Sequence, residues 1–440
     1  MVPHDRSAVL FMLLLVGCGS DPRFIFEKKP VAEVRHHGWR MDVPDERRGN
    51  APFLRALFTR EGNYLLTFGP GLSEWDPNTG ELIRTLPGQL DGNDLIVADG
   101  THHRILMRRG GVAPHLPEAR GLGIWDLRDG TLIGMIPEED RDRAIPVGFT
   151  TSGEPVVFRF GDVEVWQADG SGVRTTIMPP AGKRFCERGG TYAMNYHDQQ
   201  CHALSPTGRW LAVAAWNPDE RPMLLEPFLA DLVEGTLVRI EVPDSVGGRG
   251  IRSFAFSSDE RTLALGASGG MWIQDRSPTD RGSAARQGPF IRGEHQRNQF
   301  LSPMAFTAND TRIVALGDQL QINTYDVQTG ELIGRVAPPF EDLEGTVRVS
   351  ADGSRAVVYR FVADILVVID GVTGKQRGYV CPYFCNRYHN PVDVPYAVSP
   401  DGRRVVSGGR LGAGLWDADA DTLIAPLTDP SRPPLESRGL

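Results

Sequence analysis

The sequence lacks an excess of positive charge: its formal net charge is −9 at pH 7, and its only lysines are Lys28, Lys29, Lys183 and Lys375. Nucleic-acid binding needs a concentrated basic face that neutralises phosphates, so this charge balance argues against a nucleic-acid partner. The sequence also contains no phosphate-binding loop and no H-E-x-x-H zinc motif. We therefore predict no catalytic residue, no cofactor and no metal site.

Apolar residues near the N-terminus form one run, Ala8 to Val16, which is too short to cross a bilayer as a helix. It follows Arg6 and ends in Leu15-Val16-Gly17-Cys18. This pattern resembles a bacterial lipoprotein signal, which implies cleavage before Cys18 and acylation of that cysteine. An ordinary secretory signal with an incidental cysteine is the alternative. Gly19 after the cysteine favours the outer membrane, with the periplasmic or surface side unresolved.

A cassette of roughly forty to fifty residues recurs along the chain, as in repeat proteins. Each copy has a short apolar run, an S-x-D-G-like turn, further apolar runs and a W-D-x-x-T-G-E-L-like ending. Alternating apolar residues between turns predict four short strands per copy. The Asp position of the ending falls at Asp76, Asp126, Gln167, Asp231, Asp275, Asp326, Asp370 and Asp417. The longer interval from Gln167 to Asp231 indicates an insertion.

The turn Ser399-Pro400-Asp401-Gly402 and the ending Trp416-Asp417 resemble those of the WD40/YVTN-type β-propeller superfamily. The resemblance implies an all-β protein with a single propeller of four-stranded antiparallel blades over residues 51–428. Eight blades are expected, with seven as the alternative. The Gly-His pair of eukaryotic WD40 repeats is missing, so we do not expect their Asp–His–Ser/Thr–Trp network. The docking Trp of quinoprotein propellers is missing as well.

Outside the propeller, residues 1–17 are expected to be the signal peptide and 18–50 a lipid-anchored tether. A strand from this tether, over 31–34 or 39–43, could close the ring. Residues 429–440 are expected to form a disordered tail.

Four cysteines remain when Cys18 is set aside, and an oxidising compartment favours their pairing. Cys186, Cys201, Cys381 and Cys385 allow three pairings, of which we favour Cys186–Cys201 and Cys381–Cys385. Two alternatives stay open. The first pair lies near histidines and could ligate zinc, and the second could be redox-active.

Both cysteine segments are expected to join the outer strand of one blade to the inner strand of the next. They would then lie on the same face, on opposite sides of the ring. Stiffened loops lose little entropy on binding, so these segments predict a binding surface. Its candidate residues are Tyr196, His197, His202, Tyr383, Phe384, Arg387, Tyr388 and His389, together with His115. An Arg-rich stretch that begins at Arg276 is expected to be solvated.

These observations predict an exported, membrane-anchored propeller that serves as a non-catalytic interaction platform in the bacterial cell envelope. Its partner would be an envelope protein or a glycan, its membrane contact would be the lipid anchor alone, and the propeller would be monomeric. One alternative is a propeller enzyme, a glycan lyase or hydrolase, with its site at the channel mouth. Another is a structural subunit of an outer-membrane assembly complex.

Overall fold

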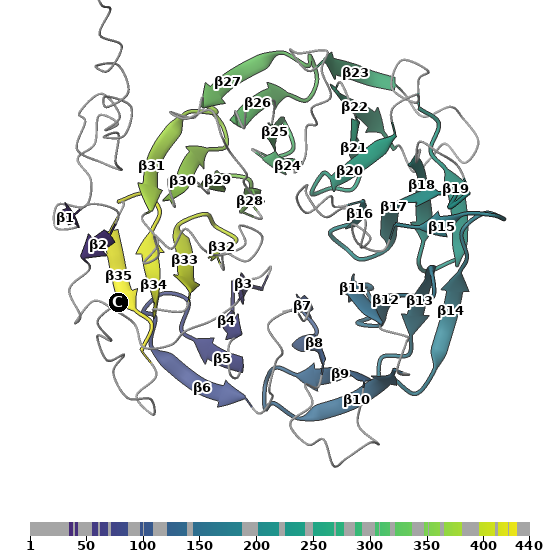
Figure 1. Cartoon of the computed structure of the whole chain (residues 1–440), viewed down its shortest axis with the longest axis horizontal. Coiled ribbons are helices and arrows are strands. Elements are labelled where there is room, and N and C mark those ends of the chain that lie inside the picture. The colour runs from purple at the N-terminus through teal and green to yellow at the C-terminus, as the bar shows by residue number, and fades with distance from the viewer. Residues whose placement is uncertain are drawn as a thin grey trace, which may run out of the picture.

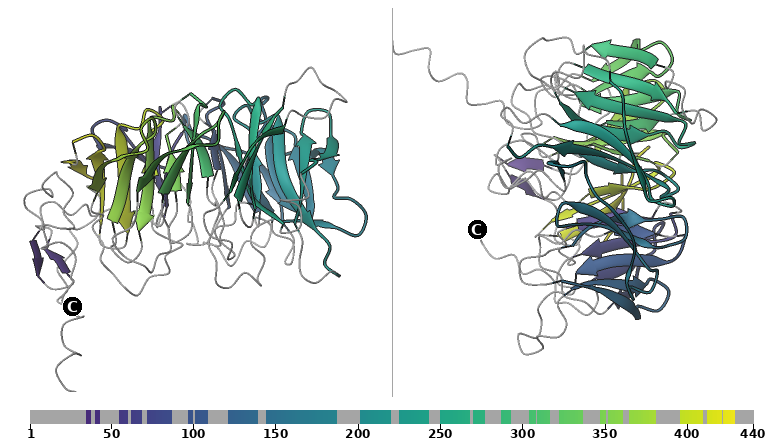
Figure 2. Two further views of the ribbon diagram at one scale, coloured as in Figure 1. Left: turned by 90° about the horizontal axis from the view of Figure 1, so that it is seen from above. Right: turned by 90° about the vertical axis from the view of Figure 1, so that its right-hand side faces the viewer.

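Eight four-stranded antiparallel sheets stand side by side in a ring, so the protein is an eight-bladed β-propeller (Figure 1). The computed structural model describes residues 35–37, 40–42, 55–59, 62–68, 72–86, 97–99, 101–108, 121–138, 144–186, 201–219, 225–242, 250–267, 270–276, 287–292, 304–307, 309–316, 322–336, 347–350, 352–360, 365–380, 396–409, 412–420 and 422–428. Within these residues there are strands and turns but no helix. The strands run roughly along the axis of the ring (Figure 2).

Each blade takes its strands from one stretch of the chain, ordered from the ring's axis outward. Blades one to four are β3 (Arg55–Phe58), β4 (Leu65–Phe68), β5 (Leu72–Trp75) and β6 (Leu82–Leu86); β7 (Val97–Asp99), β8 (Arg104–Arg108), β9 (Gly121–Asp126) and β10 (Leu132–Pro137); β11 (Ile145–Phe149), β12 (Pro155–Arg159), β13 (Asp162–Trp166) and β14 (Val173–Ile177); and β15 (Arg184–Phe185) with β16 (His202–Leu204), β17 (Trp210–Trp216), β18 (Glu226–Asp231) and β19 (Thr236–Arg239).

Blades five to eight follow the same order. They are β20 (Ile251–Phe256), β21 (Thr262–Ala267), β22 (Gly270–Asp275) and β23 (Gln287–Arg292); β24 (Met304–Thr307), β25 (Arg312–Leu316), β26 (Ile322–Asp326) and β27 (Leu332–Val336); β28 (Val347–Val349), β29 (Arg355–Arg360), β30 (Ile365–Asp370) and β31 (Gln376–Val380); and β32 (Tyr396–Val398), β33 (Arg404–Gly409), β34 (Gly412–Asp417) and β35 (Thr422–Pro426).

The hydrophobic core lies between neighbouring blades. Successive residues of a strand point to opposite faces of its sheet. On β4, Leu65 packs into the cluster shared with blade eight, while Leu66 packs into the cluster shared with blade two. Both side chains are fully buried. Because both faces of the second and third strands are covered, these strands read as apolar runs.

The eight-bladed prediction is therefore confirmed, and so is the register of its repeat. The alternation of apolar residues in the last copy predicts strands at 394–398, 404–407, 412–416 and 422–427, and these coincide with β32 to β35 within about two residues, the usual uncertainty of strand ends. The turn glycines Gly62, Gly208, Gly353 and Gly402 have φ between 68° and 76°. A residue with a Cβ rarely adopts this conformation, which explains the glycine of each S-x-D-G-like turn.

No N-terminal strand completes a blade among the described residues. β1 (Arg35–His37) and β2 (Arg40–Asp42) pair with each other in a sheet of their own. The last blade consists of four consecutive strands, β32 to β35. The described residues therefore contain no ring-closing strand of the expected kind. The first and last blades join through a shared core that contains Leu65 and Trp75 of blade one and Leu415 and Leu427 of the last blade.

Candidate functional site

The two faces of the ring differ in the segments that they carry. Because the strands of a blade alternate in direction, the first-to-second and third-to-fourth connections lie on one face, which we call the turn face. The second-to-third connections and the blade-to-blade connections lie on the other, the loop face. Residues 109–120 and 381–395 lie outside the described residues.

An aspartate organises the third-to-fourth-strand turns of the turn face. Asp76 Oδ1 accepts hydrogen bonds from the backbone N–H groups of Asn78 and Thr79, both at 2.8 Å. Asp326 makes the same two bonds in blade six, each at 2.9 Å. Because these bonds stabilise the ionised carboxylate, they hold the pKa values of Asp76 and Asp326 below the ordinary range.

Polar bonds between blades also gather on the turn face. Ser258 in blade five donates its backbone N–H and its hydroxyl to Asp310 in blade six, at 2.7 and 2.6 Å. Thr307 Oγ1 donates to the Gly371 carbonyl of the next blade at 3.0 Å. These contacts tie neighbouring blades together on the turn face.

Blade four contains the main irregularity of the ring. Its inner strand is split into β15 and β16, and both parts pair with β17. Phe185 lies opposite Ala215, and His202 lies opposite Val213. Ala214 fills the position between them: its carbonyl accepts the Cys186 N–H at 2.9 Å, and its N–H donates to the Cys201 carbonyl at 2.8 Å. Residues 187–200 therefore leave and re-enter one strand without breaking its ladder.

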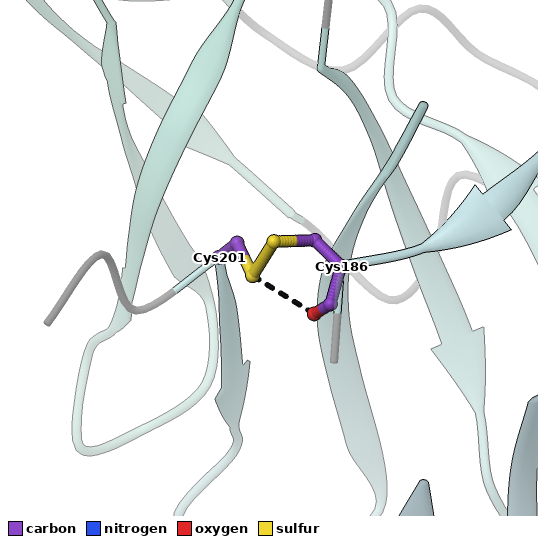
Figure 3. The surroundings of a disulfide bond; sticks show 2 residues. All are labelled: Cys186 and Cys201. Carbon is purple, nitrogen blue, oxygen red and sulfur yellow. Dashed lines mark hydrogen bonds between the residues drawn. A yellow bond between two sulfur atoms is a disulfide. The ribbon is translucent and has the colours of Figure 1, made fainter. Parts of the chain in front are cut away.

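A disulfide joins the two ends of this insertion. Cys186 and Cys201 are bonded, with their Cα atoms 5.9 Å apart (Figure 3). The favoured pairing of these two cysteines is confirmed, and the cysteines do not ligate zinc. The expected position of the segment is corrected, because it interrupts an inner strand instead of linking blades three and four. Cys201 is fully buried in the core between blades four and five.

Most residues of the predicted binding surface lie outside the described residues: Tyr196, His197, Tyr383, Phe384, Arg387, Tyr388, His389 and His115. The same holds for Cys18, Cys381 and Cys385. His202 is described. Its ring meets Phe158 edge-on, with centroids 4.9 Å apart, and Phe158 is fully buried between blades three and four. His202 thus packs against the neighbouring blade.

One half of the WD40-type network is present, although we did not expect the network. Trp75 Nε1 donates to Thr67 Oγ1 at 2.7 Å, and Trp416 Nε1 donates to Ser407 Oγ at 3.0 Å. These bonds join the third strand to the second in blades one and eight. Thr67 and Ser407 lie at the same position of the second strand relative to these tryptophans, whereas Met107 occupies that position opposite Trp125 in blade two.

Arg276 is packed against aromatic rings, which corrects its expected exposure to solvent. Its guanidinium carbon lies 4.6 Å from the ring centre of Trp210 and 5.2 Å from that of Phe256. Arg209 also lies over Trp210, at 4.9 Å. Burial lowers the pKa of Arg276 to about 10. These cation–π contacts join blades four and five.

No group of three or more His, Cys, Asp or Glu side chains among the described residues could hold a metal ion. Gly266-Ala267-Ser268-Gly269-Gly270 fits the G-x-S-x-G pattern. A nucleophile elbow joins a strand to a helix, whereas this segment joins antiparallel β21 to β22. In the same described part of the chain, no helix is long and apolar enough to cross a membrane.

Comparisons with known proteins support the fold and indicate no function. No family model matches the chain. No curated protein matches it either. Among solved structures, the computationally designed Ika8 protein is similar with a TM-score of 0.52 and 13% sequence identity, over 84% of this chain and 97% of that one. Such low identity supports the fold alone, and a fold hosts many functions.

Proposed function

We propose that this protein is an exported, lipid-anchored propeller of the WD40/YVTN type, which serves as a non-catalytic interaction platform in the bacterial cell envelope. The carrying observation is the insertion at residues 187–200, which the Cys186–Cys201 disulfide fixes to the inner strand of blade four. Its partner is an envelope protein or a glycan that binds the loop face.

The ladder of blade four does not need the insertion. Both parts of the inner strand keep their register with β17 on either side of it. Loops on a rigid scaffold are the common carriers of binding residues. A disulfide at the base restricts the loop ends, which lowers the entropy lost on binding. The bond also supports export, because disulfides persist in oxidising compartments.

The direction of the chain also supports the loop face as the binding surface. β3 begins blade one and runs toward the turn face, so the chain that precedes Arg55 reaches the ring on the loop face. β35 ends on that face too. A tether from an acylated Cys18 would therefore hold the loop face toward the membrane, where an envelope partner is available.

The test is a pull-down of the tagged full chain from detergent-solubilised envelopes. Its matched variant has two glycines in place of residues 187–200, between Cys186 and Cys201. We expect a partner that the wild-type chain retains and the variant loses, with the same thermal unfolding midpoint for both. A partner retained equally by both would remove the insertion from the binding surface, and no partner in repeated trials would refute the platform.

Lipid attachment at Cys18 has its own measurement, the mass of the N-terminal peptide from envelope-purified protein. We expect an acylated Cys18 at the new N-terminus. A Cys18→Ala variant should lose the modification. An unmodified N-terminus beyond residue 18 would refute the anchor and leave the platform standing.

A further inference from the structure

The hairpin between β12 and β13 exposes an aromatic side chain in a conformation that does not suit it. Phe160 has φ of 55° and Gly161 has φ of 92°. Two-residue hairpins of this kind favour Asn, Asp or Gly where φ is positive. Yet a phenylalanine stands at the tip, with 71% of its surface exposed. Turn chemistry does not explain this residue, whose ring centre lies 5.3 Å from the guanidinium carbon of the preceding Arg159.

A second exposed apolar side chain lies beside this hairpin. Val163 pairs with Ile177, the last residue of β14, so Met178 continues the strand alongside the hairpin end. Met178 is 68% exposed. The next blade approaches the same point, because Phe185 N–H donates to the Gly161 carbonyl at 3.4 Å. We call Phe160 and Met178 the blade-three tip.

Cations lie close to the blade-three tip, beside the hairpin carboxylate of Asp162, although the net charge of the chain is −9. Lys183 and the exposed Arg184 precede Phe185 directly. Lys183 and Arg239 both pair with Glu226, so two cations face one carboxylate there. At physiological salt, charges beyond about 8 Å are largely screened. The nearby cations therefore dominate the electrostatic interaction of this edge of the ring with an anionic surface.

The blade-three tip lies on the loop face, because it belongs to a second-to-third-strand turn and a blade-to-blade connection. The chain enters blade one and leaves blade eight on the same face. We propose that the tip docks this edge of the ring onto a bilayer, with Phe160 and Met178 inserted among acyl chains and Lys183 and Arg184 at anionic headgroups. An apolar tip flanked by cations is the pattern of peripheral membrane contact. The biological setting rests on the membrane anchoring proposed above.

Vesicle binding tests the contact without the lipid anchor. The mature chain is exported unlipidated as Cys18→Ser and sedimented with vesicles of phosphatidylglycerol and phosphatidylcholine in equal parts. We expect binding that weakens about tenfold for each of Phe160→Asn and Met178→Asn, since each loses one buried apolar side chain. Arg184→Gln should weaken it about fivefold, and pure phosphatidylcholine should bind less than the mixture.

The matched control is Val233→Asn with Val372→Asn. These valines are 46% and 55% exposed in third-to-fourth-strand turns of the turn face, so vesicle binding should not change. Asn suits positive φ, so Phe160→Asn should fold at least as well as the wild type, which thermal unfolding checks. No vesicle binding by the wild type, or equal binding by the tip variants, would overturn the proposal. Loss of an envelope partner without any vesicle binding would assign the tip to a protein instead. Neither result depends on acylation of Cys18.

Discussion

An aspartate at the end of the third strand stabilises the following turn in the same way in several blades. Its carboxylate accepts hydrogen bonds from the backbone N–H groups two and three residues on, and a glycine four residues on completes the turn. In blade one these residues are Asp76, Thr79 and Gly80, whose φ is 74°. Gly80 also touches the neighbouring blade, since an added Cβ would lie 3.0 Å from Ala425 Cβ. The D-x-x-T-G pattern is therefore a turn and an interblade contact at once.

Ionisation of these aspartates predicts a pH dependence of stability. The pKa of Asp76 is lowered from 3.8, chiefly by the hydrogen bond from Thr79 N–H. A lowered folded pKa adds stability above the unfolded value, and that stability is lost as pH falls through the folded value. Asp76→Asn should therefore be less stable than wild type at neutral pH by only about 0.5 kcal/mol, because solvent screens this largely exposed carboxylate, and the gap should close as pH falls below about 5 and through the lowered folded pKa.

Urea unfolding at a series of pH values measures this effect. Asp76→Asn combined with Asp326→Asn should double the gap, because blades one and six do not touch and distant sites add. A gap that stays constant down to the acid end would assign the loss to hydrogen-bond geometry, with ionisation playing no part.

At the scale of one element, the inner strand of blade four shows that the propeller tolerates an insertion within an inner strand. The strand needs only a few residues on either side, Arg184 and Phe185 before it and His202 to Leu204 after it. Its ladder to β17 is continuous because Ala214 bonds to both ends of the insertion.

Removal of the disulfide should cost more stability when the insertion is present. Cross-linking acts mainly on the unfolded chain and grows with loop length. For the separation of 15 residues between Cys186 and Cys201, the loss in Cys186→Ala/Cys201→Ala should be about 3 kcal/mol. With two glycines in place of residues 187–200, the same double substitution should cost about 1 kcal/mol less. Urea unfolding followed by tryptophan fluorescence checks both pairs; equal losses would contradict the loop-length account.

The sequence predicted the cysteine pair but misplaced the segment that it closes, for a physical reason. Only Arg184 and Phe185 represent the first half of the inner strand. Two residues cannot show the period of two that marks a strand, so the stretch read as a connection between blades. The exposed Phe160 escaped notice similarly, because an Arg-Phe-Gly-Asp segment resembles a strand residue followed by a turn.

At the scale of the whole molecule, the repeat predicted the ring because each copy supplies both faces of one blade. The W-D aspartate positions coincide with the ends of β5, β9, β18, β22, β26, β30 and β34 to within one residue. The way in which the ring closes could not be predicted from the sequence, since it depends on whether a segment distant in the chain pairs with an outer strand. The structure builds every blade from consecutive strands and closes blade eight on blade one by side-chain packing around Leu65, Trp75 and Leu415.

A circular permutant tests this mode of closure. Residue 428 would be joined to Arg55 by a short Gly–Ser linker, and the chain would be opened between blades five and six, within 293–303. Because each blade of the described residues comes from one stretch of the chain, those blades stay intact, and the new linker replaces an ordinary blade-to-blade connection. We expect the permutant to unfold within about 4 °C of a wild-type chain that starts at the same residue, the shift that about 1 kcal/mol or less gives in a domain of this size. A permutant that folds only when residues 31–43 remain attached before Arg55 would show that a strand from this segment closes the ring.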